Sequence, residues 1–352
     1  MRPVRKDANA RLPATCNSVD RQLVMHTHTT ANPPGKIRIG TRESKLALLQ
    51  TDIVLARLKA LSGQIEIEVV PITTKGDKVL DRPIAELGGR GVFVKELEEA
   101  LLSNEVDIVV HSLKDLPTDM PDKLALAAVL DRDDPRDVLL SKDGLEFLSL
   151  PSASRIATSS RRRAAQLLYL RKDIEFVDIR GNIPTRVRKF DEGYCDAIVL
   201  AGAGLNRLKL QGRISQYFSV ETVTPAAGQA ALAIECRREE GGLLELLKQI
   251  EDKEARQEAD CERAYLGELG GGCSVPVGAS AKVSGETITL TGCIASLDGK
   301  ELLRESITAN IEANPEKAAA IGLALANKML AAGGRKIMDE LRRQTPNVVS
   351  AP

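Results

Sequence analysis

Strand-like and helix-like patterns alternate along the chain from residue 36 onward, and this alternation restricts the possible folds more than any other feature. Residues 36–40 alternate polar and apolar side chains as a short strand does, and the segment that follows repeats apolar residues every three or four positions, which is typical of a helix with one buried face. Strand patterns return at 65–70 and 106–110, with a helix pattern over 93–103 between them. Strands that alternate with helices predict a parallel or mixed sheet of the doubly wound α/β kind.

A second series of strands and helices follows the polar segment 131–135, which we interpret as a crossing between two lobes. Further strands, expected from about 276 to 311, include a hairpin turn and are bordered by helix patterns. We therefore predict two doubly wound α/β lobes and a small C-terminal α+β domain. The expected boundaries are a disordered tail over 1–35, a first lobe over 36–130 and 225–240, a second lobe over 131–224, and a third domain over 241–352.

The composition excludes several kinds of function. The 352 residues carry 49 Lys and Arg against 49 Asp and Glu, so no overall field would recruit nucleic acid or an anionic membrane. Tryptophan is absent and aromatic residues make up 3%, which argues against stacking on single-stranded nucleic acid. The six cysteines form no Cys-x-x-Cys pair and no apolar run is long enough to span a membrane, so we expect a soluble protein with no disulfide framework, zinc site or other metal.

Arginines follow the predicted ends of several strands. Arg42 follows the first strand, Arg180 and Arg207 follow later ones, and Arg161-Arg162-Arg163 opens a helix. Three cations at a helix N-terminus oppose the helix dipole, so a purely structural role would place them badly. Guanidiniums grip carboxylates and phosphates with paired hydrogen bonds. The sequence therefore predicts a cleft lined by arginines that binds an anionic ligand.

The strand at 106–110 ends in the polar run His111-Ser112-Leu113-Lys114-Asp115-Leu116-Pro117, at the edge where open α/β sheets bind their ligands. Asp115 stands beside Lys114, whose ammonium would favour the ionised carboxylate. The alternative is a strand-end turn with two solvated charges. His111 is the only histidine outside the tail, and no Gly-x-Ser-x-Gly motif accompanies it, so a serine triad is not indicated.

A thiol lies in the run Gly270-Gly271-Gly272-Cys273-Ser274-Val275-Pro276. Three glycines let a ligand approach the backbone closely, and a thiolate is a strong nucleophile. Cys273 could therefore carry a covalent group. The alternative is an ordinary buried cysteine beside a turn, because free cysteine is among the most buried residue types.

Six segments, with order and spacing intact, resemble the porphobilinogen deaminase family, whose members are also called hydroxymethylbilane synthases. Each segment alone is a weak signal, but all six together are specific. They are Ile39-Gly40-Thr41-Arg42-Glu43-Ser44, Gly91-Val92-Phe93-Val94-Lys95-Glu96-Leu97-Glu98, Val110-His111-Ser112-Leu113-Lys114-Asp115-Leu116-Pro117, Thr158-Ser159-Ser160 with the arginines after it, Arg180-Gly181-Asn182, and the loop around Cys273.

The resemblance implies two lobes built like those of periplasmic binding proteins, followed by a third domain. It implies a transferase of tetrapyrrole (heme, chlorophyll or corrin) biosynthesis. The reaction would condense four porphobilinogen molecules head to tail into hydroxymethylbilane, with release of ammonia. The cofactor would be a dipyrromethane bound covalently through a thioether to Cys273.

Residue roles also follow from the resemblance alone. Asp115 matches the catalytic carboxylate, which would bind pyrrole N–H groups and stabilise developing positive charge. Phe93 would lie on a mobile loop over the cleft. The positions that hold the cofactor are matched by Ser112, Lys114, Thr158, Ser160, Arg162 and Arg163. The positions that bind the substrate and the growing chain are matched by Arg42, Ser44, Arg180, Arg186 and Arg207.

Two positions depart from the family pattern. Arg161 stands where an apolar residue is usual, which leaves open which two of the three guanidiniums face the cleft. Ala230 replaces the glycine that usually follows Gln229, and we expect it to stiffen that strand.

The resemblance further implies a monomer that passes its product to uroporphyrinogen-III synthase. Residues 1–35 lack the apolar centre of a secretory signal, so we expect a cytoplasmic location, or a plastid one if this tail is a transit peptide. Two other hypotheses use the same residues. One is a two-lobed carboxylate receptor without catalysis, and the other is a thiol enzyme that pairs Cys273 with His111 as its base.

Overall fold

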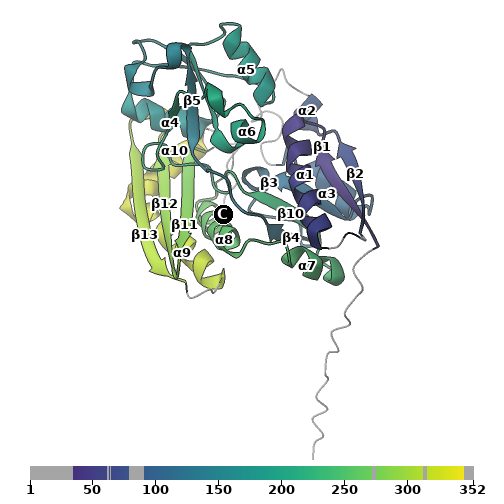
Figure 1. Ribbon diagram of the computed structural model, residues 1–352. Coiled ribbons are helices and arrows are strands. Elements are labelled where there is room, and N and C mark those ends of the chain that lie inside the picture. Colours follow the sequence, from purple (N-terminus) through teal and green to yellow (C-terminus); the bar gives the residue numbers. More distant parts are fainter. Residues whose placement is uncertain are drawn as a thin grey trace, which may run out of the picture. The chain divides into compact units, whose positions relative to one another are not determined.

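The fold is built from three sheets with helices packed against them (Figure 1). The computed structural model describes residues 35–61, 63, 65–78, 91–271, 275–311 and 315–344. No helix within these ranges is both long and apolar enough to cross a bilayer. We call the first sheet with its helices the first lobe, and the second sheet with its helices the second lobe.

The first sheet has the strand order β2-β1-β3-β10-β4. β1 pairs in parallel with β2 and β3, whereas β10 runs antiparallel to both β3 and β4. The strands are β1 (Lys36–Arg42), β2 (Glu66–Ile72), β3 (Ile108–Ser112), β4 (Leu124–Val129) and β10 (Leu232–Arg237). The helices of this lobe are α1 (Lys45–Leu61), α2 (Lys75–Lys78), α3 (Lys95–Leu102), α7 (Gly241–Lys248) and the short 3-10 helix η2 (Leu113–Asp115).

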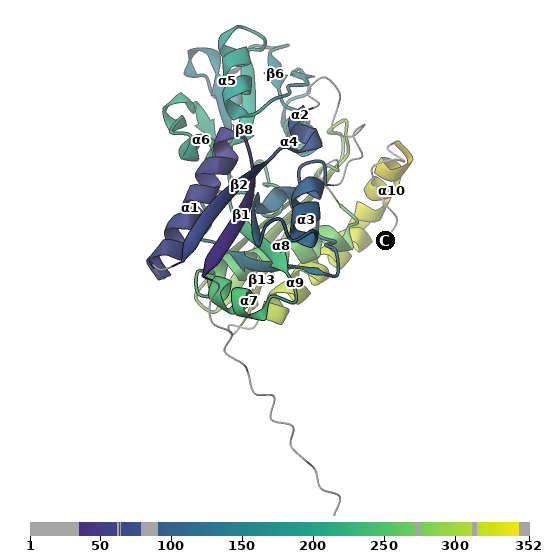
Figure 2. The ribbon, with the colours of Figure 1, turned by 90° about the vertical axis from the view of Figure 1, so that its right-hand side faces the viewer.

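Alternating side chains of β3 supply two cores on opposite faces of the first sheet. Ile108 belongs to the core that also contains Leu58 of α1, and Val109 belongs to the core that contains Leu97 of α3. All four side chains are fully buried. Figure 2 shows β1 and β2 between α1 and α3. The buried run of apolar residues in this strand is therefore explained by helices on both faces of the sheet.

The second sheet repeats this arrangement with the order β7-β6-β8-β5-β9. β6 pairs in parallel with β7 and β8, and β5 runs antiparallel to β8 and β9. The strands are β5 (Asp137–Ser141), β6 (Arg155–Ala157), β7 (Glu175–Val177), β8 (Ala197–Ala201) and β9 (Gln216–Tyr217). The α-helices are α4 (Arg161–Leu170), α5 (Ile183–Asp191) and α6 (Gly202–Arg207).

The third sheet is an antiparallel meander with the order β11-β12-β13. Helices α8 and α9 pack closely, because a Cβ added at Gly322 of α9 would lie 2.1 Å from the carbonyl oxygen of Cys261 in α8. The elements are α8 (Lys253–Glu268), β11 (Val277–Ser284), β12 (Thr287–Ala295), β13 (Leu302–Asn310), α9 (Pro315–Met329), a π-helical turn (Leu330–Gly334) and α10 (Arg335–Gln344).

The predicted fold class is confirmed: two doubly wound α/β lobes precede a small α+β unit. The pattern did not predict β4, β5 and β9, and β9 spans only two residues. The expected helix stop at Gly333-Gly334 is only a break, where Gly333 adopts a φ of 110° and α10 follows. The domain boundaries remain predictions, and so does the tail over 1–35, of which residues 1–34 lie outside the described residues.

Candidate active site

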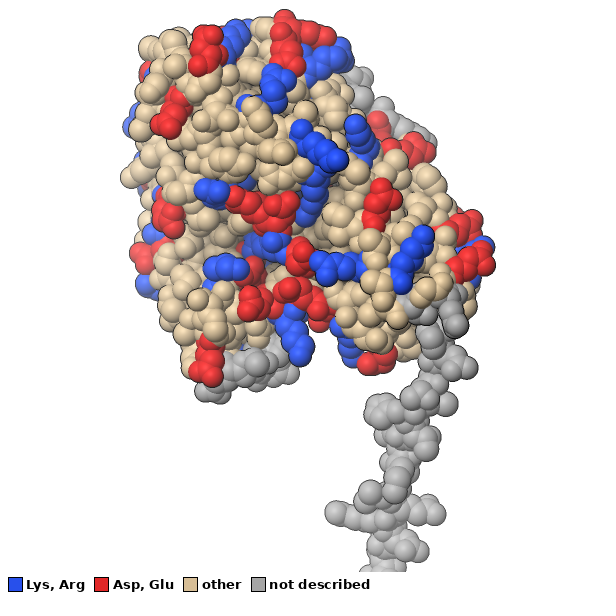
Figure 3. Space-filling view, viewed as in Figure 1, with Lys and Arg blue, Asp and Glu red and all other residues tan. Residues whose placement is uncertain are grey.

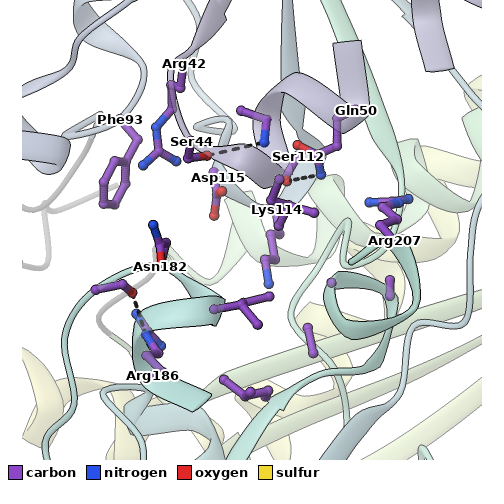
Figure 4. Close-up of a pocket in the computed structure, with 18 of the residues that line it drawn as sticks. Arg42, Ser44, Gln50, Phe93, Ser112, Lys114, Asp115, Asn182, Arg186 and Arg207 are labelled. Atoms are coloured by element: carbon purple, nitrogen blue, oxygen red, sulfur yellow. Dashed lines mark hydrogen bonds between the residues drawn. The ribbon is translucent and has the colours of Figure 1, made fainter. Parts of the chain in front are cut away.

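A cavity of about 360 Å³ is lined by residues from both lobes (Figure 4). Its lining includes the start of α1, the η2 turn after β3, and the first turns of α4, α5 and α6. These segments follow β1, β3, β6, β7 and β8, so the carboxyl ends of parallel strands deliver them to one place. On the face seen in Figure 3, lysines and arginines are interspersed with acidic residues over the surface.

The η2 turn brings Lys114 and Asp115 into the cavity, and close packing holds the turn in place. Leu113 beside them is buried, and a Cβ added at Gly228 would lie 2.7 Å from its Cγ. Gly228 adopts a φ of 74°, which disfavours other residues. Lys114 Nζ donates a hydrogen bond of 3.3 Å to Gln229 Oε1. Burial lowers the pKa of Lys114 to about 8, although neighbouring Asp115 opposes this shift.

The start of α4 presents one guanidinium to the cavity. Arg162 and Arg163 are both buried, but only Arg163 lines the described cavity. Arg162 donates to Asp137 and to the Thr224 carbonyl oxygen, both at 2.7 Å. Arg163 Nε also donates to Asp137, at 3.0 Å. Burial would raise the pKa of Asp137, but the two guanidiniums hold it well below its usual range. This arrangement identifies Arg163 as the arginine of the run that lines the described cavity.

The two hydroxyls before α4 support this helix start. Ser160 is the N-cap, and its side chain accepts a hydrogen bond of 3.4 Å from the backbone N–H of Arg163. Thr158 Oγ1 accepts from the backbone N–H of Ser160 at 3.2 Å. Neither hydroxyl belongs to the cavity lining. Both affect the cavity indirectly, because they hold the start of the helix that carries Arg163.

Three further arginines of the second lobe line the cavity. Arg186 Nε donates to the Gly181 carbonyl oxygen at 2.7 Å, and Arg207 NH2 donates to the Ala230 carbonyl oxygen at 2.5 Å. Arg180 is the third. Burial, together with nearby guanidiniums, lowers the pKa of Arg186 to about 10. Arg207 Nε also lies 3.9 Å from Asp133 Oδ2, but Asp133 does not line the cavity. The described lining therefore holds more cations than carboxylates.

The first lobe adds Arg42, which lies over the ring of Phe93 with its Cζ 4.1 Å from the ring centroid. Arg42 also forms a two-pronged ion pair with Asp77, through Nε at 3.1 Å and NH2 at 2.5 Å. Gln50 of α1, buried in the same wall, donates to Ser112 Oγ at 2.8 Å. Asp77 and Gln50 were not predicted from the sequence.

The structure places most of the predicted site residues in this lining. Those that line the cavity are Arg42, Ser44, Ser112, Lys114, Asp115, Arg163, Arg180, Arg186 and Arg207. Thr158, Ser160 and Arg162 do not line it, and Cys273 lies outside the described residues. His111 is buried against Glu235, with Nε2 2.9 Å from Oε2, so its described partner is a carboxylate.

The donor set fits a ligand rich in carboxylates. Among the described residues, the lining includes Lys114 and five arginines but only two carboxylates, Asp77 and Asp115. Hydroxyl and amide groups from Ser44, Ser112 and Asn182 complete the polar wall. Within the described ranges no group of three or more His, Cys, Asp or Glu is arranged to hold a metal ion. The surplus of guanidiniums therefore suits an organic anion that carries several carboxylates.

Two models of one protein family match most of the chain. A family model described as "Porphobilinogen deaminase, dipyromethane cofactor binding domain" matches residues 37–245, and the model of the family's C-terminal domain matches residues 256–331. The chain belongs to the porphobilinogen deaminase family. The family resemblance expected from the six segments is thereby confirmed.

Relatives named porphobilinogen deaminase match over most of their length. The protein of Syntrophotalea carbinolica is 46% identical over 305 residues, which cover 87% of this chain and 96% of the relative. That of Brevibacillus brevis is 46% identical over 311 residues, covering 88% and 99%. That of Synechococcus elongatus is 45% identical over 314 residues, covering 88% and 97%.

Proposed function

We propose that this chain condenses four porphobilinogen molecules head to tail, releases one ammonia molecule at each step, and frees the tetrapyrrole by hydrolysis with one water molecule as hydroxymethylbilane. The observation that carries this proposal is the cavity itself, in which Asp115 is surrounded by cationic side chains from both lobes. Each porphobilinogen carries an acetate and a propionate, so a growing chain gains negative charge with every unit. The surplus of guanidiniums suits that charge. Membership of the porphobilinogen deaminase family supports the reaction.

Asp115 is the group that we assign to the chemistry. An ionised carboxylate can accept a hydrogen bond from a pyrrole N–H and stabilise the positive charge that develops as the amino group leaves. Lys114, next to it, holds a substrate or cofactor carboxylate and balances the charge of Asp115. The short η2 turn fixes both residues at the cavity wall.

A dipyrromethane joined to the Cys273 thiol, when bound, supplies the pyrrole terminus to which the first porphobilinogen is attached. We assign its carboxylates to Ser112, Lys114 and Arg163, which line the cavity. Three residues outside the lining, Thr158, Ser160 and Arg162, would help to position Arg163 for this binding. The two hydroxyls hold the start of α4, and Arg162 shares the Asp137 carboxylate with Arg163.

The remaining cations would bind incoming porphobilinogen and the lengthening chain. They are Arg42, Arg180, Arg186 and Arg207, together with the hydroxyl of Ser44. We also propose a cytoplasmic monomer in which residues 36–130 with 225–240, 131–224 and 241–352 form three domains. A monomer with an accessible cavity could release hydroxymethylbilane to uroporphyrinogen-III synthase.

The test is the intact mass of the purified protein beside a Cys273→Ser variant, with Cys16→Ser as the matched control. We expect an excess mass of two linked pyrrole units on the wild type and on Cys16→Ser, and none on Cys273→Ser. Purified wild type should also convert porphobilinogen to hydroxymethylbilane. A bare polypeptide that stays bare after incubation with porphobilinogen would contradict the proposal and favour a carboxylate receptor.

A further inference from the structure

Arg42 is the one guanidinium of the described cavity wall that is paired with a carboxylate of the same wall. Its Nε and NH2 groups donate to the two oxygens of Asp77 at 3.1 and 2.5 Å. Arg186 donates to a neutral carbonyl oxygen. Arg207 donates to a carbonyl oxygen and lies 3.9 Å from Asp133, and Arg163 is held by the fully buried Asp137. Neither of these two carboxylates belongs to the cavity lining. Anchoring an arginine at this wall therefore does not require a charged partner inside the cavity.

The Asp77 carboxylate is held in place from a second side. Thr74 Oγ1 donates to Asp77 Oδ2 at 2.7 Å, and the backbone N–H of Asp77 donates to the Thr74 carbonyl oxygen at 3.0 Å. Burial would raise the pKa of Asp77, but its bonds to Arg42 and Thr74 lower it overall, so the carboxylate is ionised at neutral pH. Its side chain is nevertheless 21% exposed, which leaves it within reach of a ligand in the cavity.

The Arg42 guanidinium is also held by packing. It lies over the face of Phe93, and a Cβ added at Gly76 would lie 2.1 Å from the same ring. The backbone N–H of Gly76 donates to the Val92 carbonyl oxygen at 3.1 Å. Figure 4 shows Arg42 beside Phe93 at the cavity. The guanidinium can therefore keep its position when its anionic partner changes.

We propose that Asp77 is a resident carboxylate that a porphobilinogen carboxylate must displace from Arg42, and that this exchange weakens and tunes substrate binding. The inference rests on the proposed function, because it takes Arg42 as a substrate-binding group. The exchange replaces one paired set of hydrogen bonds with another of the same kind. The binding free energy that the incoming carboxylate gains is therefore only the difference between the free energies of the two ion pairs. Asp77, which lines the same cavity, also repels the anion that replaces it.

Such an exchange is useful to an enzyme that must release each carboxylate from a site after it has bound there. A guanidinium without a resident partner would hold every carboxylate tightly and slow the movement of the chain to its next position. Asp77 lowers the affinity of Arg42 without removing its geometry. In this role Asp77 sets affinity and takes no part in bond making.

The experiment compares wild type with Asp77→Asn and Thr74→Val, with Asp107→Asn as the matched control. Asn keeps an acceptor for Thr74 but loses the charge that competes for Arg42. Val removes the hydroxyl that holds Asp77 and keeps the shape of Thr74. Asp107 forms a similar ion pair with Arg38 in the same lobe, with an N–O distance of 2.7 Å, but does not line the cavity.

Two quantities are measured: the KM for porphobilinogen, and the Kd, by calorimetry, for a pyrrole that carries acetate and propionate arms but no aminomethyl group. The second ligand cannot release ammonia, so its affinity is independent of turnover. We expect Asp77→Asn to lower this Kd about threefold to tenfold, as loss of a partly exposed competing ion pair would. Thr74→Val should lower it by less, and Asp107→Asn should leave it unchanged.

An unchanged or higher Kd in Asp77→Asn would overturn the exchange and make Asp77 a structural anchor of Arg42. If that variant does not fold, an unchanged or higher Kd in Thr74→Val overturns it instead. A wild type that neither consumes porphobilinogen nor binds the pyrrole contradicts the proposed function itself. A wild type that does both, with variants that bind no more tightly, contradicts the exchange alone.

Discussion

The sheets of the two lobes have the same arrangement of parallel and antiparallel strands, but the lobes contribute different charges to the cavity. The first lobe provides both carboxylates of the described lining, Asp77 and Asp115, together with Arg42 and Lys114. The second lobe provides no carboxylate to that lining and four arginines: Arg163, Arg180, Arg186 and Arg207. In both lobes the ends of parallel strands lie at the cavity. The residues that follow each strand determine the charge that the lobe contributes there. We infer that the first lobe performs the chemistry and the second lobe holds the anions.

The strongest challenge to this comparison is the removal of Asp115. We expect Asp115→Asn to lower the rate of porphobilinogen consumption by about 10²- to 10⁴-fold, because the variant loses the charge that stabilises the developing cation. Asp119→Asn is the matched control, since Asp119 is exposed on the segment after Asp115 and does not line the cavity. Activity of Asp115→Asn within tenfold of wild type would show that the first lobe does not hold the essential carboxylate.

The second lobe should depend on Asp137 for stability. Asp137→Asn leaves the buried cations Arg162 and Arg163 without their carboxylate, so we expect the free energy of unfolding to fall by about 3–5 kcal/mol. Asp191→Asn is the control: Asp191 pairs with Arg213 at an exposed position, and its loss should cost less than about 1 kcal/mol. Denaturant unfolding followed by circular dichroism measures both losses.

The contribution of Asp137 also predicts how the free energy of unfolding changes with pH. The pKa of Asp137 is held below its usual range, so its contribution to stability is complete above about pH 4 and is lost as the pH falls below that value. The acid loss of stability should therefore be shallower in Asp137→Asn than in wild type. Equal losses for Asp137→Asn and Asp191→Asn would mean that the buried cluster contributes no more than a surface pair.

A smaller effect should appear at Lys114, the cation next to Asp115, which we propose to be the catalytic carboxylate. Its pKa is lowered to about 8 by burial, so the free protein loses this charge between pH 7 and 9. We expect the KM for porphobilinogen to rise several-fold over that range in wild type relative to Lys114→Arg, which stays charged. Comparison of the two proteins cancels the ionisation of the substrate itself.

The lowered pKa of Lys114 should also affect folding stability: a rise in pH that weakens substrate binding should stabilise the folded protein. Between about pH 8 and the ordinary lysine value near 10.4, the unfolded chain binds a proton that the folded chain does not. The stability of wild type should therefore rise with pH in that window relative to Lys114→Arg. A pH profile of KM that is the same in both proteins would remove Lys114 from the binding of carboxylates.

Much of the site was predictable because its residues follow strands directly. Asp115 follows β3, and Arg180 and Arg207 lie at or beyond the ends of their strand patterns, so a local reading of the chain found them. Asp77 was missed, although it comes shortly after β2, because its partner Arg42 is 35 positions away. The parallel pairing of β1 and β2, with Arg42 opposite Ile72, brings the two together. The signal that could have found it is a polar residue just beyond the end of a strand.

The run of three arginines shows where local reading fails. Its position at a helix start predicted an anion site, but the choice among Arg161, Arg162 and Arg163 depends on the rotation of α4 and on the buried Asp137. Asp137 begins β5, a strand that the pattern did not predict. The hydrophobic periodicity of the sequence does not reveal an ion pair that is buried between elements far apart in the chain.

The sequence by itself determined the α/β lobes, the family, and the cationic character of the cleft, because periodicity and strand-end residues are local properties of the chain. Only the tertiary structure decided which cations line the cavity and which carboxylates hold them. Those choices depend on side-chain direction and on ion pairs between residues far apart in the chain. Arg42 with Asp77, and Arg163 with Asp137, are the two pairs in which that difference matters most.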